Sequence, residues 1–161
     1  MNYKIQKAKD NIASVQKQCH FIDGDEKKYF KESIFAMQAL ESNSYLLTQA
    51  ENNPESLKNA IINLSSMGLS LNPSKKQAYL VPYKGSVDLQ ISYMGLIDLA
   101  INDGAILWAK SDVVRESDTF VITGIDTQPN HQYRPFASKL ERGNVVGVYC
   151  IAKVPNGDYI T

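Results

Sequence analysis

The first 24 residues are mostly polar, but their apolar members recur with the period of an α-helix. These apolar positions are Ile5, Ala8, Ile12 and Val15, and Gly24 then interrupts the pattern. Side chains three or four positions apart share one face of a helix, so the segment predicts an amphipathic helix.

A second helix is predicted from Glu26 to Leu40, because apolar residues again lie one turn apart. The expected inward stripe consists of Phe30, Ile34, Met37 and Leu40. Polar residues end the pattern at 42–44, and the apolar run 45–47 predicts no more than a short turn.

The third predicted helix has the clearest boundaries. Asn53 is a favourable N-cap, and Pro54 suits the first helical position because it lacks a backbone N–H. Gly68 offers the left-handed stop that ends many helices. The apolar stripe between these boundaries is Leu57, Ile61, Leu64 and Met67.

The apolar period changes after Gly68. Two runs rich in β-branched and aromatic residues, Gln77–Tyr83 and Ser86–Tyr93, flank Lys84-Gly85 and predict a β-hairpin. In the second run, alternation assigns one set of side chains to the core and the other to the open face. The core set is Val87, Leu89, Ile91 and Tyr93, and the open set is Asp88, Gln90 and Ser92.

A helix over Gly95–Asn102, with Leu96, Leu99 and Ala100 on one face, is expected to end at Gly104. The rest of the chain predicts short strands at 105–109, 112–115 and 119–124, followed by a loop containing Pro129 and Pro135. Residues 144–154 form a run that is apolar on both faces, which predicts a strand covered on both sides. Residues 159–161 are expected to pair with it across the turn at 155–158.

Together these elements predict an α+β fold. The hairpin at 77–93 and the strand at 144–154 are expected to share a short antiparallel sheet, packed against the helices at 54–67 and 95–103. Residues 1–52 are expected to be a helical, oligomerising region and residues 53–161 an α+β core.

The formal net charge is zero, with 17 basic and 17 acidic side chains, which is unlike a strongly basic nucleic-acid-binding domain. Charge is segregated locally, however. Residues 56–87 contain no Asp or Glu but include Lys58, Lys75, Lys76 and Lys84. Lysines beside Tyr79 and Tyr83 suit phosphate binding and base stacking, and they equally suit a solvated loop beside a packed strand.

The sequence contains no motif for nucleotide hydrolysis or for nucleophilic catalysis. Asp112, Glu116 and Asp118 are the nearest approach to a metal set, but strand alternation would scatter them, and His131 has no partnered nucleophile. Cys19 and Cys150 are expected to be reduced thiols. We expect no enzymatic activity, no cofactor and no metal site. We also expect no membrane span and no export, so the expected location is the cytoplasm.

The runs GLSLNP, QAYLVPYKG and LQISYMGLIDLA resemble the RecT-type family of phage single-strand annealing recombinases. Residues 117–120, His131, residues 145–149 and Asn156-Gly157 are similar to the same family, so the resemblance covers Pro54–Thr161. It implies an ATP-independent protein that coats single-stranded DNA, anneals complementary strands into duplex, forms rings or filaments and works beside a 5′→3′ exonuclease. It also implies that residues 53–161 are the core that binds single-stranded DNA, inside a bacterial host cell. Further helices and a basic segment are implied beyond residue 161, so that the C-terminal part of this core is missing here.

Annealing requires that phosphates be held while base edges stay free. The hairpin residues that we expect to contact DNA are Lys75, Lys76, Tyr83, Lys84, Gln90 and Ser92. Further candidates are Arg115, Arg134, Lys139, Arg142 and Lys153, of which Arg134 and Lys139 lie in an acid-free stretch, 127–140. The alternative is an oligomeric binding or assembly module with no role in nucleic-acid binding.

Overall fold

The computed structural model describes residues 3–19, 26–124 and 126–161. They form two compact units, Met1–Leu99 and Ala100–Thr161, which are described separately below. The interruption predicted at Gly24 lies outside the described residues. Among the helices that the structure describes, none combines the length and apolar character that a membrane span requires.

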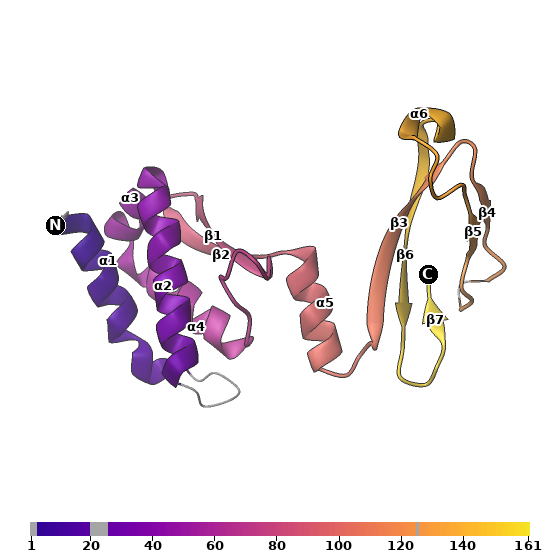
Figure 1. The fold of residues 1–161 in the computed structure, drawn as a ribbon. Coiled ribbons are helices and arrows are strands. Elements are labelled where there is room, and N and C mark those ends of the chain that lie inside the picture. The colour runs from indigo at the N-terminus through magenta and orange to yellow at the C-terminus, as the bar shows by residue number, and fades with distance from the viewer. Residues whose placement is uncertain (1–2, 20–25, 125) are drawn as a thin grey trace. The chain divides into compact units, whose positions relative to one another are not determined.

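The first unit contains four helices and a hairpin (Figure 1). Its helices are α1 (Tyr3–Ser14), a 3₁₀ turn (Gln16–Gln18), α2 (Glu26–Ser42), α3 (Ser44–Asn52) and α4 (Pro54–Ser66), and its strands are β1 (Ala78–Tyr83) and β2 (Ser86–Ile91). The ten-residue α5 (Tyr93–Asn102) follows. The predicted helices are present, and so is the predicted hairpin. The predicted α+β class is confirmed.

Helix α3 replaces the short turn that the sequence predicted at 45–47. The side chain of Asn43 accepts a hydrogen bond from the backbone N–H of Leu46 at 3.0 Å, which caps the helix. Leu46, Leu47 and Ala50 are buried on its inner face. The local signal was this N-cap, which is easily missed when the helix has only nine residues.

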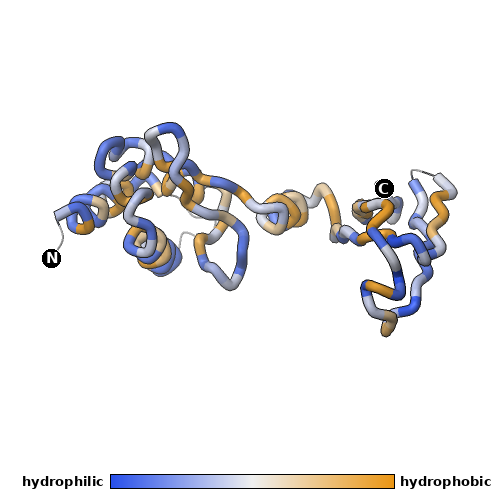
Figure 2. Tube along the Cα trace, turned by 90° about the horizontal axis from the view of Figure 1, so that it is seen from above, coloured by the Kyte–Doolittle hydropathy of each residue, from blue (hydrophilic) through white to orange (hydrophobic). Residues whose placement is uncertain are grey.

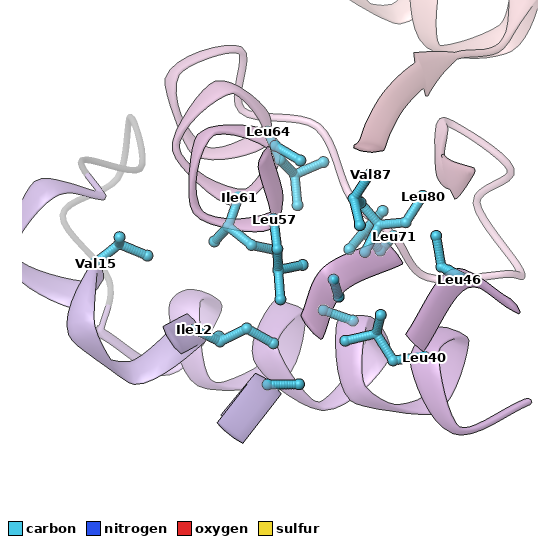
Figure 3. Packing of buried hydrophobic residues seen from close by; sticks show 14 of the residues in the cluster. Ile12, Val15, Leu40, Leu46, Leu57, Ile61, Leu64, Leu71, Leu80 and Val87 are labelled. Atoms are coloured by element: carbon cyan, nitrogen blue, oxygen red, sulfur yellow. The ribbon is translucent and has the colours of Figure 1, made fainter. Parts of the chain in front are cut away.

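Helix α4 follows the prediction closely. The side chain of Asn53 accepts from the N–H of Ser56 at 3.2 Å, Pro54 is the first helical residue, and Gly68 has φ of 68°. The apolar stripes of α1 and α4 meet in the core, where they pack with α2, α3 and the hairpin (Figure 3). The core residues labelled there are Ile12, Val15, Leu40, Leu46, Leu57, Ile61, Leu64, Leu71, Leu80 and Val87.

Helix α2 is rotated relative to its predicted orientation. Phe30 is 67% exposed and Ile34 is 42% exposed, whereas Tyr29, Glu32 and Ala36 are buried. The predicted stripe was therefore wrong for Phe30 and Ile34, whereas Met37 and Leu40 do pack in or against the core. Polar partners account for the rotation: the hydroxyl of Tyr29 donates to the carbonyl of Ile12, and the carboxylate of Glu32 accepts from two groups of the loop after α4.

The two groups are the hydroxyl of Ser70, at 2.6 Å, and the N–H of Leu71, at 2.7 Å. A buried carboxylate is tolerated when such donors satisfy it. Glu32 thereby ties α2 to the segment that leads into the hairpin.

The hairpin has the predicted two-residue turn. Tyr83 pairs with Ser86, and Lys84 and Gly85 both have positive φ, 45° and 82°. Positive φ at both central residues is the type I′ geometry, which matches the twist of the strands. The predicted alternation is confirmed for Val87, which is buried, but β2 ends at Ile91, before the predicted end at Tyr93.

The start of α5 is fixed against the start of β1. The hydroxyl of Ser92 donates to the carbonyl of Lys76 and accepts from the N–H of Gly95, and the side-chain amide of Gln77 donates to Asp98 at 2.7 Å. A Cβ on Gly95 would lie 2.3 Å from the carbonyl oxygen of Gln77, so only glycine fits this approach.

Figure 2 shows α5 as a largely apolar helix. It begins at Tyr93, two residues before the predicted start. On the predicted apolar face, Leu99 packs against the core of the first unit, whereas Leu96 is exposed. The helix docks through the glycine contact and the polar bonds at its first turns, and these are tertiary contacts that helical periodicity does not reveal.

The second unit is built from two small antiparallel sheets. Its elements are β3 (Trp108–Arg115), β4 (Thr119–Val121), β5 (Asn130–Gln132), α6 (Lys139–Arg142), β6 (Val145–Lys153) and β7 (Tyr159–Ile160). The predicted pairing of β7 with β6 is confirmed. The strands predicted at 105–109 and 112–115 are one continuous strand, and the predicted loop contains β5 and α6.

The prediction that the hairpin and the strand at 144–154 share a sheet was wrong. Strand β6 lies between β3 and β7, and β1 pairs only with β2 among the described strands. Strand β3 pairs along the length of β6 on one edge, and β7 pairs with Ala152 and Lys153 on the other, so the partners of β6 come from the second unit.

Strand β6 also has one open face. Tyr149 and Ile151 point to the side that β4 and β5 cover, but Val146 and Val148 on the other side are exposed, Val148 to 75%. The prediction that both faces are covered is therefore wrong for the residues that the structure describes. A run of β-branched residues favours a strand through backbone propensity even where one face remains in water.

Candidate nucleic-acid interface

The hairpin presents one face to solvent, which we call the outer face. The register places Tyr79 opposite Gln90, Val81 opposite Asp88, and Tyr83 opposite Ser86 on this face. Tyr79, Tyr83 and Gln90 are exposed. The two tyrosines are four residues apart on β1, which is roughly 14 Å at about 3.4 Å per residue. Together with the amide of Gln90 on the facing strand, their rings form a surface on which planar groups can stack.

Lysines lie at both ends of the outer face. At the turn, the ammonium of Lys84 lies 5.1 Å from the centroid of the Tyr83 ring, which is within cation–π range. At the open end, Lys75 and Lys76 belong to a turn organised by Asn72, whose carbonyl accepts from both of their N–H groups. Lys76 has φ of 53°.

None of these three lysines forms an ion pair with a residue that the structure describes. A strand of six residues spans roughly 20 Å at about 3.4 Å per residue. That length corresponds to roughly six phosphates at the B-form spacing of about 3.4 Å along one strand. The predicted lysines thus bracket the outer face instead of clustering at one point.

Two acidic groups reduce the local positive charge. Lys58, the fourth lysine of the acid-free window, forms an ion pair with Glu55 at 2.8 Å. Asp88 lies in the middle of the outer face and is exposed. The positive potential is therefore strongest at the two ends of the hairpin.

Tyr93 was predicted to pack in the core, and this prediction was wrong. It is 72% exposed, because it begins α5 instead of continuing β2. Ser92, a predicted DNA contact, uses its hydroxyl to join Lys76 to the N-terminus of α5. Its contact with DNA stays a prediction.

A hollow of about 460 Å³ lies between α4 and β2. Uncharged polar side chains of α4 line it, including Asn59, Asn63 and Ser66, together with Asp88 of β2. The sequence analysis missed this feature. Its signal was the polar face of α4, which is opposite the stripe that defined the helix.

In the second unit, the predicted cations divide into two groups. Arg115 donates to the carbonyl of Gly143 at 2.7 Å, and Arg142 binds the carboxylate of Asp118 at 2.9 and 2.5 Å. Both are thus used in holding the fold. Lys153 lies 5.7 Å from the Tyr159 ring, and Arg134 and Lys139 are exposed without an ion pair to any described residue.

Asp118 is the centre of a buried polar and aromatic cluster. Its side chain is fully buried and also lies 3.2 Å from Nε2 of His131, whose Nδ1 lies 3.2 Å from the hydroxyl of Tyr149. The hydrogen bonds from Arg142 lower the pKa of Asp118 far below its usual range. Burial raises the pKa of Tyr149.

The rings of Phe120 and Tyr149 pack 5.0 Å apart above this cluster. The contacts join β4 and β5 to the sheet of β3 and β6. Glu116, another acid considered for a metal site, accepts hydrogen bonds from Asn144, which lower its pKa. Within the described ranges, no three His, Cys, Asp or Glu side chains are grouped as metal ligands.

Comparison with known proteins bears on the same segments. The model of the RecT family matches residues 31–161, which include the hairpin, α5 and the whole second unit. The chain belongs to the RecT family. The match confirms the resemblance seen in the sequence.

The chain is also similar to Protein RecT of Escherichia coli (strain K12), with 35% identity over 111 residues. The aligned part is 63% of this chain and 40% of that protein. The chain thus spans about two fifths of the length of this RecT relative.

Proposed function

We propose that this RecT-family chain binds single-stranded DNA along the outer face of the hairpin and holds it for annealing to a complementary strand. The observation that carries the proposal is the pair of exposed rings, Tyr79 and Tyr83, between lysines that form no ion pair with a described residue. Lysines attract phosphates, and aromatic rings stack on bases regardless of sequence.

Stacking on the tyrosines would use the flat face of a base and leave its pairing edge free. A second strand can then test complementarity by base pairing, while Lys75, Lys76 and Lys84 hold the first strand by its phosphates. The free energy of annealing would come from pairing itself. The sequence lacks a phosphate-binding loop, in agreement with an ATP-independent reaction.

The test is a titration of labelled oligo-dT at two salt concentrations with the wild-type chain and with a Lys75→Ala, Lys76→Ala, Lys84→Ala variant. Each phosphate contact on a single strand contributes about 0.7 to the slope of log affinity against log salt. The triple variant should bind more weakly and lose about 2 units of slope.

A matched triple change, Lys7→Ala, Lys9→Ala and Lys17→Ala, removes the same charge from α1 and the turn after it. It should leave most of the slope in place. If both triple variants lost affinity equally, net charge alone would explain binding, and the hairpin would not be the site.

We also propose that the chain self-associates through the exposed side of α2. Phe30 and Ile34 line a hollow of about 440 Å³ between α1 and α2, together with Ile5 and Met37. A second copy of the chain would cover this apolar surface. A Phe30→Glu, Ile34→Glu variant should scatter light as a smaller particle than the wild type, and equal particle sizes would disprove this interface.

Cooperation with a 5′→3′ exonuclease and residence in the bacterial cytoplasm stay predictions from the family resemblance. The absence of enzymatic activity also stays a prediction, made from the lack of catalytic motifs in the sequence. A pull-down with a purified exonuclease would test the first of these.

A further inference from the structure

The most exposed apolar side chains of the second unit lie in the segment between β5 and β6. Phe136 is 100% exposed and Leu140 is 92% exposed. Single exposed apolar residues are common, but a phenylalanine with its whole ring in water loses all of the free energy that burial would give it. We call residues 133–142, which contain both side chains, the tip of the second unit. Two such exposed residues four positions apart mark the tip as a contact surface.

The tip is held in place before any ligand binds. Ser138 and Glu141 form a capping box, with hydrogen bonds of 2.7 and 3.2 Å, that closes the short helix α6. At the end of that helix, Arg142 binds buried Asp118 and lies 4.1 Å from the Tyr133 ring. Ordering of the backbone therefore costs little on binding, which favours affinity.

The charge around Phe136 selects the kind of ligand. Arg134 and Lys139 flank Phe136 in sequence and are exposed, and neither forms an ion pair with a residue that the structure describes. Glu141 is the nearest acid in sequence, and its hydrogen bonds with Ser138 keep its pKa low and its carboxylate charged. Two cations and one anion leave a net positive charge beside the ring.

The core of a protein–protein interface is generally depleted of charged residues, whereas a ring between cations is the usual composition of a single-strand binding surface. We propose that Phe136 inserts against an unpaired base of bound single-stranded DNA, with Leu140 beside it and with Arg134 and Lys139 on the flanking phosphates. This inference rests on the proposed function and adds to it a second DNA contact, in the second unit.

The first experiment places a reporter at the tip. Trp108 is the chain's single tryptophan, so a Trp108→Phe, Phe136→Trp variant carries its only indole at position 136. Titration with oligo-dT at low salt should quench its fluorescence as the ring stacks. Fluorescence that stays constant while the oligonucleotide binds would overturn the proposal.

The second experiment measures affinity by the anisotropy of labelled oligo-dT. Loss of one stacked base weakens binding by roughly 5- to 160-fold, so Phe136→Ala should show a loss in that range. Phe136→Trp should bind like the wild type, and Phe136→Leu should fall between them. Because the side chain contacts solvent, circular dichroism should show all three variants folded.

The outcomes separate this inference from the proposed function. If Phe136→Ala binds DNA normally while the hairpin triple variant is impaired, the proposed insertion of Phe136 is wrong and the hairpin site stands. If Phe136→Ala is impaired while the hairpin triple variant binds normally, the insertion of Phe136 stands and the hairpin site is wrong. If the wild type does not bind oligo-dT, both fail. If Phe136→Ala loses self-association but not DNA binding, the tip is a protein contact and the inference is overturned.

Discussion

The two units of this chain are stabilised in different ways. The first has an extensive apolar core, in which Leu40, Leu57 and Leu64 are completely buried. In the described part of the second unit, Val114 and Ile151 are the buried hydrophobic side chains, and the centre is the cluster of Asp118, His131 and Arg142.

The first unit is thus stabilised mainly by apolar burial, which has no preferred direction, and the second by hydrogen bonds and ion pairs, which do. Apolar burial depends on area and volume, and it changes little with pH. A buried carboxylate depends on the geometry and charge of its partners, and loss of one partner leaves the other unsatisfied. The two units should therefore respond to different mutations and conditions.

Two probes can follow them separately. Far-UV circular dichroism mainly reports the helices, most of which belong to the first unit, and the fluorescence of Trp108 reports the second unit, where its ring packs against Tyr159 at 6.1 Å. Urea or thermal unfolding recorded by both probes tests the predictions below.

Leu57→Ala should have the largest effect. Leu57 is completely buried in the first unit, and truncation of a buried leucine costs about 2–5 kcal/mol of unfolding free energy. The helical transition should shift strongly and the Trp108 transition little. Leu96→Ala, at an exposed leucine of α5, is the matched control and should shift neither by more than about 0.5 kcal/mol. An equal shift in both probes would show that the units unfold as one.

Arg142→Ala should produce the reverse pattern. It leaves the carboxylate of Asp118 buried without its main partner, so the Trp108 transition should move to lower temperature by several degrees while the helical transition is retained. Arg134→Ala removes the same charge from an exposed position in the same segment. If the two variants melted alike, the cluster would not stabilise the second unit.

Gly95→Ala tests a contact of α5 with the hairpin in the first unit. A Cβ would lie 2.3 Å from the carbonyl oxygen of Gln77, so the helix must shift, at a cost of about 1–3 kcal/mol. Gly147→Ala, where a Cβ would meet nothing within 4 Å, is the control in the second unit and should be nearly neutral. A neutral Gly95→Ala would mean that α5 is not fixed there.

Acidification should destabilise the second unit. The folded state lowers the pKa of Asp118 through Arg142, and also those of Glu116 and Glu141 through hydrogen bonds. Below about pH 4 the unfolded chain binds protons that the folded chain does not, so stability is present above that pH and declines as pH falls further. Asp118→Asn should flatten this decline in the Trp108 signal. An unchanged acid response in that variant would contradict the assignment.

Much of the first unit could be predicted from local sequence. The hairpin and α4 were found because their turn and cap residues, Lys84-Gly85 and Asn53-Pro54, act within a few positions of themselves. The orientation of α2 could not be predicted locally, because the hydrogen-bond partners of Tyr29 and Glu32 lie 17 and 38 residues away in the sequence. Periodicity marks a stripe but does not show which polar groups will find buried partners.

The candidate site could likewise be predicted from the sequence only in part. The lysines of the hairpin were identified from the acid-free window, and the strand alternation placed Gln90 on the open face. Arg115 and Arg142 could not be told from Arg134 in sequence, since all three are basic residues near predicted strands. Only the structure shows that two of them are bonded within the fold and one is exposed.

By itself, the sequence determined the α+β class, the caps, the hairpin and its turn, and the resemblance to the RecT family. These depend on short-range backbone preferences and on motifs that can be read along the chain. The tertiary structure alone decided the separation of the hairpin from the sheet of β6, the burial of Asp118 beside His131, and the exposure of Tyr93 and Phe136. Those outcomes depend on which distant groups compete for the same buried space and hydrogen-bonding edges, and that competition is resolved only when the whole chain packs.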